Sequence, residues 1–453
     1  MAYIRSISGL RATLGDDLTP AIVAEYSSAF STFSPEGKII VAYEGRPSGK
    51  WLSMLVCTSL IATGRQVIYI GMTPTPTVQV AIELEKAAGG IVITASHNDE
   101  RWNGLKFLNS EGIFLDKDEN MKLFQIVDEK KATYSTAHFP DFWMSENAIN
   151  LHIDKILELD IIKSEIDKIK KKKFKIVLDA VNSSGSFAVT NLLEKLNCKV
   201  VPFYADGTGK FPHNPEPLEK NLGDLMKIVK KSKANLGIAV DPDADRLVII
   251  DNNGNFIGEE LTVALAIDSV FDFYKEKKEL IAGINFSTSK VCEAIAEKYN
   301  GKVFRSPVGE INVVKKMKEV GAIIGGEGSG GVIFSECHYG RDSLVGIALV
   351  FSLLARKNKS LSDLVEEYPK FQMSKYKQDF DGNLNDLHLS LAREFEGFSL
   401  NIEDGFYLKN DDCSIQLRKS NTEPIIRIIA ESKEESLNNE LIVRVLKILN
   451  NVN

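Results

Sequence analysis

The chain has 453 residues, which at roughly 150 residues per domain suggests about three domains and several hydrophobic cores. Hydrophobic residues make up 44% and charged residues 26%, which excludes a mostly disordered, collagen-like or membrane-embedded chain. The formal net charge of −7 argues against a broad basic surface for nucleic acid or an anionic membrane, so we expect neither partner, although a local basic pocket is still compatible with it.

Strand-like and helix-like segments alternate in three rounds between residues 39 and 325. Continuous apolar runs separated by helices of roughly 10–15 residues predict parallel sheets that are covered by helices on both faces. The expected strands are 39–43, 66–71, 90–95, 175–181, 199–204, 236–240, 279–285, 302–305 and 322–325. The expected helices are 51–63, 77–87, 186–196, 222–233, 289–299 and 310–320.

The C-terminal part of the chain has a different pattern, typical of a small α+β domain. Its expected strands are 375–380, 398–402, 414–418 and 425–430, and its expected helices are 385–396 and 435–449. The fold class is therefore α/β: three similar α/β domains with mostly parallel sheets, followed by one α+β domain. We place the domains at 1–150, 151–253, 254–370 and 371–453.

The most apolar run, 344–355, is too short for a membrane-spanning helix, which needs about 20 residues, so we expect a buried helix. Residues 1–6 show no basic stretch followed by an apolar run, so we expect no signal peptide. The cysteines are scattered and form no C-x-x-C pair, which indicates reduced thiols and a cytoplasmic location. They are Cys57, Cys198, Cys292, Cys337 and Cys413.

A polar cluster follows the strand expected at 90–95, where α/β sheets place their ligands. Ser96 is a candidate nucleophile, and His97 or Lys106 are candidates for moving protons. The glycine positions of the G-x-S-x-G motif are occupied by Thr94 and Asn98, which argues against an esterase. The alternative is an ordinary polar turn.

Three closely spaced aspartates, Asp241, Asp243 and Asp245, form an anionic oxygen cluster that suits Mg²⁺ or Ca²⁺. An EF-hand loop fails, because Arg246 and Asn252 stand where that loop needs glycine and glutamate. Carboxylates beside an arginine suit a divalent ion that meets a phosphate. The alternative is a solvated turn.

A glycine-rich loop carries two polar residues, Glu327 and Ser329. Its glycines satisfy G-x-G-x-x-G, but a dinucleotide site needs a helix next, and the apolar run at 332–334 predicts a strand. We therefore expect Glu327 and Ser329 to hydrogen bond to the hydroxyls of a sugar, with a plain glycine hairpin as the alternative. Three residues follow closely and could extend the same surface: His338, Arg341 and Asp342.

A donor-rich loop lies between the strands expected at 414–418 and 425–430. Such a loop can wrap a phosphate dianion through charge-assisted hydrogen bonds, and the alternative is a plain surface loop. No Walker A loop exists, because Gly209 and Lys210 are followed by Phe211. The candidate phosphate ligands are Arg418, Ser420, Asn421, Thr422 and Arg427.

Taken in order, one per expected domain, these four motifs resemble those of the α-D-phosphohexomutases over essentially the full chain. They read T-A-S-H-N at 94–98, D-P-D-A-D-R at 241–246, G-E-G-S-G at 326–330 and R-x-S-N-T-E-P-x-x-R at 418–427. In that family they are the phosphoserine, magnesium, sugar-binding and phosphate-binding loops.

The resemblance implies four domains around a central cleft and a net phosphate shift between O6 and O1 of a hexose through a bound 1,6-bisphosphate. It implies a phosphoserine at Ser96 and Mg²⁺ held by the serine phosphate with Asp241, Asp243 and Asp245. Lys106 and His97 become candidates near the reacting phosphate, and Arg11 and Arg246 become anion stabilisers. Arg341 joins Glu327 and Ser329 as a substrate-binding candidate, and Arg418 and Arg427 grip the phosphate that does not react.

The expected partners are small-molecule sugar phosphates, with a hexose 1,6-bisphosphate as activator, and the expected assembly is a monomer or homodimer. Glucosamine phosphate is the preferred substrate, because Glu327 offers a carboxylate near an amino group. Mannose or glucose phosphate is the alternative, because S-N-T in the phosphate loop also resembles phosphomannomutases. Remoter readings are a metal-dependent phosphatase and a non-enzymatic sugar-phosphate binder.

The chain departs from the family pattern at several positions. Pro242 replaces a glycine of the metal loop, and Asp99 replaces a proline after S-H-N. Ala42 and Glu44 depart from the pattern G-x-D-x-R-x-S-G. Gly331 stands where many members have a histidine, and His338 is a candidate substitute for it.

Overall fold

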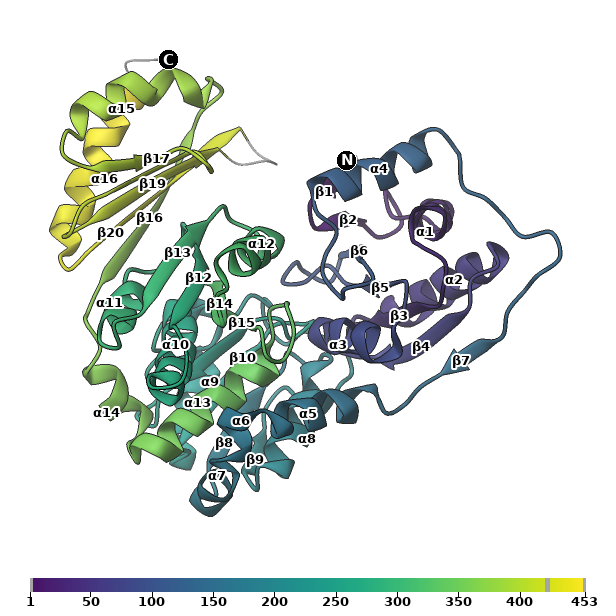
Figure 1. The fold of residues 1–453 in the computed structure, drawn as a ribbon, viewed down its shortest axis with the longest axis horizontal. Helices are drawn as coiled ribbons and strands as arrows, with labels where there is room; N and C mark the ends of the chain where they lie inside the picture. The colour runs from purple at the N-terminus through teal and green to yellow at the C-terminus, as the bar shows by residue number, and fades with distance from the viewer. Residues whose placement is uncertain (1–2, 420–423, 451–453) are drawn as a thin grey trace.

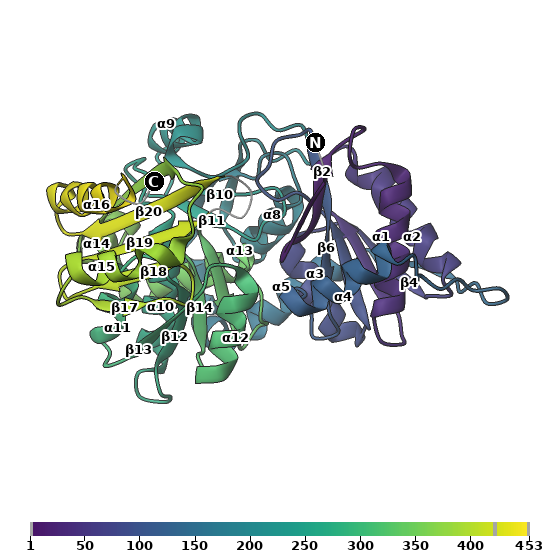
Figure 2. The same cartoon turned by 90° about the horizontal axis from the view of Figure 1, so that it is seen from above.

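The computed structural model describes residues 3–419 and 424–450, which form four sheets with helices packed around them (Figures 1 and 2). The fold class predicted from the sequence is confirmed, with one refinement. The first three sheets are mixed, because each ends in antiparallel strands, and the fourth is wholly antiparallel. The proposed domain boundaries near residues 150, 253 and 370 stay a prediction.

The first unit is a seven-stranded sheet in the order β1-β2-β6-β5-β3-β4-β7, flanked by helices. Strands β5, β3, β4 and β7 run parallel, whereas β1, β2 and β6 are antiparallel to their neighbours. The elements are β1 (Ile4–Ser6), β2 (Gly9–Thr13), α1 (Pro20–Phe33), β3 (Ile39–Tyr43), α2 (Gly49–Ala62), β4 (Val67–Met72), α3 (Thr75–Glu85), β5 (Gly89–Ile93), β6 (Trp102–Leu108), α4 (Lys117–Asp128) and β7 (Phe142–Met144).

The second unit is a four-stranded sheet in the order β11-β10-β8-β9, in which only the β10–β11 pair is antiparallel. Three helices connect it to the first unit: α5 (Ala148–Glu158), α6 (Asp160–Lys163) and α7 (Ile166–Lys172). The other elements are β8 (Lys175–Asp179), α8 (Gly185–Lys195), β9 (Lys199–Pro202), α9 (Gly223–Ser232), β10 (Leu236–Val240) and β11 (Leu247–Ile250).

The third unit repeats this plan in the order β13-β12-β14-β15 and shares one hydrophobic core with the second. The apolar run at 344–355 lies inside α13, as a buried helix, and no helix within the described residues is long and apolar enough to cross a membrane. The elements are α10 (Glu260–Tyr274), β12 (Ile281–Asn285), α11 (Val291–Glu297), β13 (Lys302–Ser306), α12 (Glu310–Val320), β14 (Ile324–Glu327), β15 (Gly331–Phe334), α13 (Ser343–Lys357) and α14 (Leu361–Glu366).

The fourth unit is a five-stranded sheet in the order β16-β20-β19-β18-β17 with its own core. Figure 1 shows it beyond the third unit, reached from α14 through β16. The expected helix at 385–396 divides into a short 3-10 turn and α15. The elements are β16 (Gln372–Asp379), α15 (His388–Glu394), β17 (Ser399–Asn401), β18 (Phe406–Lys409), β19 (Ser414–Lys419), β20 (Ile425–Ser432) and α16 (Glu435–Asn450).

The four motif loops share one structural setting. Each connects two antiparallel neighbours in a sheet: β5 to β6, β10 to β11, β14 to β15 and β19 to β20. The strand β6, which follows the Ser96 loop, is absent from the strands expected from the sequence. A hairpin loop is held by hydrogen bonds on both sides, so it can present side chains rigidly.

Candidate active site

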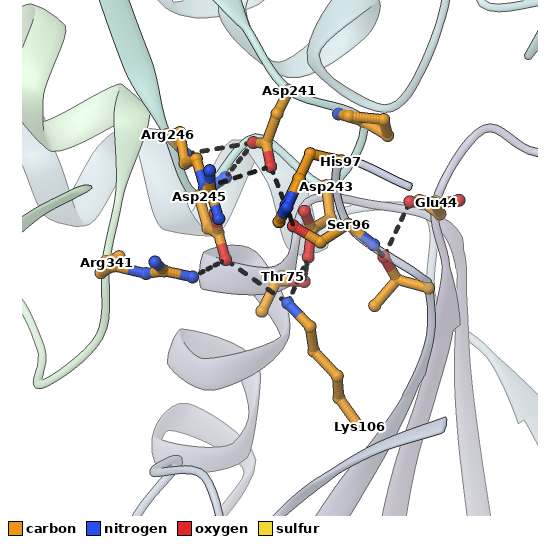
Figure 3. A network of polar contacts seen from close by, with 12 residues as sticks. Glu44, Thr75, Ser96, His97, Lys106, Asp241, Asp243, Asp245, Arg246 and Arg341 are labelled. Atoms are coloured by element: carbon orange, nitrogen blue, oxygen red, sulfur yellow. Dashed lines mark hydrogen bonds and ion pairs between the residues drawn. The ribbon is translucent and has the colours of Figure 1, made fainter. Parts of the chain in front are cut away.

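Ser96 lies in the loop between β5 and β6, with its backbone in the left-handed region at φ +50°. Ser96 as a whole residue is 1% exposed. The hydroxyl donates to Oδ2 of Asp241 at 3.1 Å and lies 3.3 Å from Nδ1 of His97 (Figure 3). A non-glycine residue in this region costs on the order of 1–3 kcal/mol and persists only where the surroundings hold it. The surrounding contacts therefore fix the position of the Ser96 hydroxyl.

A buried ion pair between Glu44 and Arg46 supports the Ser96 loop. Nη2 of Arg46 donates to the carbonyl oxygen of Ser96 at 2.9 Å and also to that of Asn98. The hydroxyl of Thr94 donates to Oε2 of Glu44 at 2.7 Å. Burial raises the pKa of Glu44 even though Arg46 opposes it. Glu44 stood out in the sequence only as a departure from the family pattern, and the structure gives it this supporting contact.

The acidic triad Asp241, Asp243 and Asp245 occupies the loop between β10 and β11 and is fully buried. One carboxylate oxygen from each lies within 4.8 Å of the others. The backbone N–H groups of Asp245 and Arg246 donate to Oδ1 of Asp241 at 3.2 and 3.1 Å, which closes the turn. Figure 3 shows the three carboxylates converging toward Ser96.

The acidic triad fits a hard cation on its own chemistry. Oδ1 of Asp243 and Oδ1 of Asp245 are buried without a hydrogen-bond partner among the described residues, which is costly for a carboxylate. Burial, together with Asp245 and Asp243, raises the pKa of Asp241 well above its usual value. A divalent cation would satisfy the orphaned oxygens and stabilise the ionised carboxylates. The triad can therefore hold a metal ion.

Lys106 reaches the acidic triad from β6, the strand next to the serine loop. Its Nζ lies 2.7 Å from Oδ2 of Asp243 and 3.4 Å from Oδ2 of Asp245. Thr75 at the start of α3 donates its hydroxyl to the same oxygen of Asp243 at 2.8 Å. Burial lowers the pKa of Lys106, but the two carboxylates outweigh burial and leave the pKa raised. The ammonium form is therefore stabilised beside Ser96.

His97 and Arg246 flank the triad together with Glu216. Nε of Arg246 lies 3.9 Å from Oδ2 of Asp241 and 3.9 Å from Oδ1 of Asp245. Oε1 of Glu216 lies 3.8 Å from Arg246 and 4.0 Å from Nε2 of His97. The positive charge of Arg246, followed by burial, lowers the pKa of His97 well below its usual value. The imidazole is therefore neutral at physiological pH.

Arg341 ties the second and third units together. Its guanidinium donates to three carboxylates: Nε to Glu310 at 3.0 Å, Nη1 to Glu327 at 2.7 Å and Nη2 to Asp245 at 2.6 Å. Burial raises the pKa of Glu310 to about 7. Since every nitrogen of the guanidinium contacts protein, Arg341 acts through Asp245 and Glu327 in this structure; its expected contact with substrate stays a prediction.

Glu327 is the last residue of β14, and Ser329 lies in the loop between β14 and β15. Oε1 of Glu327 accepts from Nδ2 of Asn285 at 2.8 Å and from the backbone N–H of Gly309 at 2.9 Å. Gly330 has φ +90°, and a Cβ there would lie 2.4 Å from the carbonyl oxygen of Leu247. The loop therefore needs this glycine to pack against the second unit.

A cavity of about 710 Å³ is lined by residues of the third and fourth units, among others, and these two units are neighbours in Figure 1. Its lining includes Glu327, Ser329, Arg418 and Arg427. Nε of Arg418 donates to Oδ1 of Asp404 at 2.8 Å. The other expected phosphate ligands, Ser420, Asn421 and Thr422, lie outside the described residues.

A smaller cavity of about 150 Å³ contains Ser96, Lys106 and Arg11. Nη1 of Arg11 donates to Oδ1 of Asn98 at 3.3 Å, in the serine loop. The two cavities share Arg246, Glu327 and Arg341 in their linings. The structure thus brings residues from all four units to one continuous site.

His338 and Asp342 do not join this surface. His338 is 2% exposed and contacts Asp342 at 3.0 Å, and Asp342 also accepts from the first backbone N–H groups of α13. The expectation that these two residues extend the sugar-binding surface is therefore wrong. His338 is also not placed to substitute for the histidine that Gly331 replaces.

Sequence reasoning missed several residues that complete the site. They are Thr75, Glu216 and Glu310, together with the pairing of Glu44 and Arg46. Glu216 lies in the segment N-P-E-P at 214–217, between β9 and α9. Thr75 and Glu310 begin α3 and α12, and nothing in their local sequence marks them, because their partners lie in other units.

Comparison with known proteins gives consistent matches. Family models described as phosphoglucomutase/phosphomannomutase alpha/beta/alpha domains I, II and III match residues 4–134, 150–254 and 259–371. A phosphoglucomutase/phosphomannomutase from Thermococcus kodakarensis is 35% identical, over 97% of each chain. A probable phosphoglucosamine mutase from Methanopyrus kandleri is 30% identical, over 96% of this chain and 95% of its own.

A solved structure shares the whole fold. The crystal structure of a phosphoglucomutase/phosphomannomutase family protein from Burkholderia thailandensis superimposes with a TM-score of 0.85. It is 23% identical, and the match covers 99% of this chain and 98% of that one. At this identity the likeness supports the fold, including the placement of the fourth unit.

Proposed function

Because the chain belongs to the phosphoglucomutase/phosphomannomutase family and is a phosphohexomutase, we propose that it interconverts glucosamine 6-phosphate and glucosamine 1-phosphate. One observation carries the reaction. The Ser96 hydroxyl, in contact with the acidic triad, and the arginines Arg418 and Arg427 line two cavities that share residues. One end can carry a transferable phosphoryl group, and the other can bind the phosphate that does not react.

In the proposed reaction Ser96 begins as a phosphoserine. The bond between phosphorus and Oγ of Ser96 breaks, a bond from phosphorus to the free sugar hydroxyl forms, and the hydroxyl proton passes to a nearby base. The product is a hexose 1,6-bisphosphate, which turns around in the cavity and returns its other phosphoryl group to Ser96. The same bisphosphate is the proposed activator, because it can phosphorylate an empty Ser96.

We assign the proton transfers to His97 and Lys106. Nδ1 of His97 lies 3.3 Å from Oγ of Ser96, and Lys106 contacts Asp243 and Asp245, in the same loop as the Asp241 carboxylate that accepts from Ser96. Arg11 and Arg246 are the proposed anion stabilisers. The Nε atoms of both arginines are buried without a hydrogen-bond partner within the described residues, so they can donate to phosphoryl oxygens.

Asp241, Asp243 and Asp245, with the phosphate on Ser96, are the residues that would hold Mg²⁺. Bound there, the cation offsets negative charge on the transferring phosphoryl group. The orphaned oxygens of Asp243 and Asp245 support this assignment. Without the cation, Lys106 and Arg341 are the cations that contact the triad directly by hydrogen bonds.

At the other end of the cavity, Arg418 and Arg427 are the proposed grip for the distal phosphate. Ser420, Asn421 and Thr422 of the same loop complete it in this proposal. Glu327 and Ser329 are the proposed contacts for sugar hydroxyls. Since the intermediate turns around, the grip must accept a phosphate at either C1 or C6, which suits a loop rich in hydrogen-bond donors.

The glucosamine assignment rests on the charge of the larger cavity. A sugar phosphate with an ammonium group at C2 suits a site that offers carboxylates beside its arginines. Four glutamates line the cavity: Glu216, Glu259, Glu260 and Glu327. The name of the Methanopyrus kandleri relative also supports this substrate. Glucose or mannose phosphate is the second candidate, favoured by the name of the Thermococcus kodakarensis relative.

A side-by-side kinetic assay tests the substrate. Glucosamine 6-phosphate, mannose 1-phosphate and glucose 1-phosphate are each supplied with Mg²⁺ and the matching 1,6-bisphosphate, and kcat/KM is measured for each. We expect the highest value for glucosamine 6-phosphate. A value for glucosamine at least tenfold below either of the others would replace it with the second candidate. Phosphate release at the rate of isomerisation would indicate a phosphatase and contradict the mutase assignment.

We also propose that the enzyme works in the reducing cytoplasm. All five cysteines are free thiols, and four of them are buried. Its assembly, as a monomer or homodimer, stays a prediction.

A further inference from the structure

A second cluster of metal-binding side chains lies outside the active site. It contains His152 from α5, Cys337 and His338 from the loop after β15, and Asp342 at the start of α13. One ligand atom from each lies within 4.8 Å of the others, and all four residues are buried. None of the four lines either active-site cavity. The phosphohexomutase reaction proposed above makes no use of the cluster.

One carboxylate oxygen is the centre of this cluster. Oδ2 of Asp342 lies 2.8 Å from Nε2 of His152 and 3.0 Å from Nε2 of His338. The two imidazole rings stand at 84° with their centroids 5.8 Å apart, so their nitrogens converge from different directions. The other oxygen of Asp342 accepts from the backbone N–H groups of Leu344 and Val345 and fixes the carboxylate in place.

Hydrogen bonding alone leaves this cluster incompletely satisfied. If both imidazoles donate from Nε2 to Asp342, Nδ1 of His338 is a buried acceptor, and it has no partner within the described residues. A buried acceptor without a partner costs free energy. A metal ion would use the Nε2 lone pairs that face Asp342 together with the thiolate of Cys337, and His338 would then carry its proton on Nδ1.

The donor set matches a particular class of metal. Imidazole nitrogen, thiolate sulfur and carboxylate oxygen are all ligands that Zn²⁺ takes, and four of them suit its preferred tetrahedral coordination. A thiolate and a carboxylate together carry two negative charges, which neutralise a divalent ion in a buried pocket. The acidic triad, in contrast, offers only oxygen and suits Mg²⁺.

A supporting residue orients one of the imidazoles. The hydroxyl of Thr77 in α3 lies 2.9 Å from Nδ1 of His152, and Thr77 is fully buried. A histidine that ligates a metal through one nitrogen commonly donates its other N–H to such an oxygen. This contact would leave the Nε2 lone pair of His152 directed at the cluster.

We propose that His152, Cys337, His338 and Asp342 form a structural site for one divalent transition-metal ion of the Zn²⁺ class. Bonds of about 2.0–2.3 Å to Zn²⁺ separate tetrahedral ligand atoms by roughly 3.3–3.8 Å. The nitrogen–oxygen separations of 2.8 and 3.0 Å therefore widen by less than about 1 Å on binding. Small rotations of the side chains are enough.

A metal ion bound at this site would hold together elements that connect the first, second and third units. Helix α5 packs against α3 of the first unit and against α13 of the third. Arg341 lies between His338 and Asp342 in the same loop and contacts Asp245 of the acidic triad. An ion bound here would hold that loop and therefore the position of Arg341. Its role is positioning, since none of its ligands reaches the active-site cavities.

Cobalt substitution tests the proposal on the full-length protein. The protein is freed of metal with a chelator and titrated with Co²⁺ as the probe. We expect one equivalent to produce a thiolate-to-cobalt charge-transfer band and the intense visible bands of tetrahedral cobalt, and Zn²⁺ to displace both. Cobalt at the acidic triad has only oxygen ligands and gives no thiolate band, so Asp243→Asn must keep the signal.

Three further variants complete the test. Cys337→Ser must abolish the charge-transfer band, whereas Cys292→Ser, another buried cysteine, must keep it. Thr77→Val must weaken metal affinity by about 10- to 100-fold, because it removes the hydrogen bond to His152. The absence of a thiolate band in the wild-type protein would overturn the proposal. A band that survives in Cys337→Ser would overturn it as well, because the cobalt would then be bound elsewhere.

Discussion

The two ends of the active-site cleft are built differently. At the reacting end Ser96 and the acidic triad are at most 1% exposed and are held by residues of three units. At the phosphate-binding end Arg418 is partly exposed and Arg427 is exposed, and both belong to the fourth unit, which has its own core. Packing within the folded protein therefore fixes the positions of Ser96 and the acidic triad. Binding of the distal phosphate, in contrast, depends on the position of the fourth unit relative to the other three.

Among the described residues, the third and fourth units contact each other mainly through polar groups, together with an aromatic ring contact between Phe286 and Tyr407. Ser289 donates to Glu431, and Nζ of Lys290 donates to the carbonyl oxygen of Asn410 at 2.9 Å. Asp404 accepts from the backbone of Val308 at 2.9 Å. A polar contact surface of this kind permits relative motion of domains, as a ligand that must turn around requires. Similar domain positions with and without sugar phosphate, measured by small-angle scattering, would contradict this reading.

Removing the nucleophile gives the largest expected effect. Ser96→Ala should lower kcat by at least about 10³-fold, because no phosphoryl group can then be held at the reacting end. Circular dichroism and the melting temperature should stay close to those of the wild type, since alanine keeps the Cβ and the substitution removes only the hydroxyl. Retained turnover in this variant would refute the assignment of Ser96.

Breaking the arginine contact between units is expected to be the next largest effect. Arg341→Met leaves the carboxylates of Asp245, Glu327 and Glu310 without their partner and should cost about 3–5 kcal/mol of unfolding free energy. Urea denaturation measures it. Arg356→Met is a control, because Arg356 contacts Asp272 away from the cleft and is more exposed. Equal losses in both variants would count against a special role for Arg341.

A smaller effect concerns the pH dependence of stability. Burial raises the pKa of Glu310 from 4.5 to about 7. The folded protein then binds more protons at Glu310 than the unfolded chain between these values, so stability falls as pH rises from about 4.5 to about 7. The contribution of Glu310 is about 3 kcal/mol across that window.

The matching variant isolates this contribution. Glu310→Gln cannot titrate, so urea denaturation at pH 5 and pH 7.5 should show a smaller loss of stability than in the wild type. The difference between the two proteins cancels the contributions of the other carboxylates. Identical pH profiles would show that Glu310 is ionised throughout and contradict the raised pKa.

The smallest effect is expected at the phosphate-binding end. Arg418→Ala should raise KM for the sugar phosphate by about tenfold and change kcat less, because in the proposed reaction Arg418 contacts only the phosphate that does not react. Lys419→Ala, a change of the exposed neighbour whose Nζ donates to the carbonyl oxygen of Gly382, is the control. A fall in kcat with unchanged KM would place Arg418 at the reacting end.

The same contrast explains how much the sequence could predict. The buried strands β3, β5, β8, β10 and β12 were predicted because each is a continuous apolar run. Strand β6 was missed because its sequence mixes Asn103 and Lys106 with apolar residues, and both polar side chains are buried in the site. Functional demands overrode the periodicity there.

The site was predicted where its residues are close in sequence and missed where they are not. The sequence shows the acidic triad directly, because three aspartates at alternate positions (Asp241, Asp243 and Asp245) form an unusual pattern. The contacts of Arg341 and Glu310, or of Thr75 with Asp243, join separate units, so no local pattern carries them. The preference for Arg341 as a substrate ligand followed from its position near the glycine loop, and only the fold reveals the three carboxylates around it.

The most direct test of the account is to locate the phosphoryl group. The protein is first incubated with Mg²⁺ and a hexose 1,6-bisphosphate. Peptide mass spectrometry then locates the phosphorylated residues before and after hexose 6-phosphate is added. The account predicts one phosphate per chain, at Ser96, that is lost to the added sugar, and none in Ser96→Ala. A phosphate at another residue, or none in a turnover-competent wild-type protein, would contradict it.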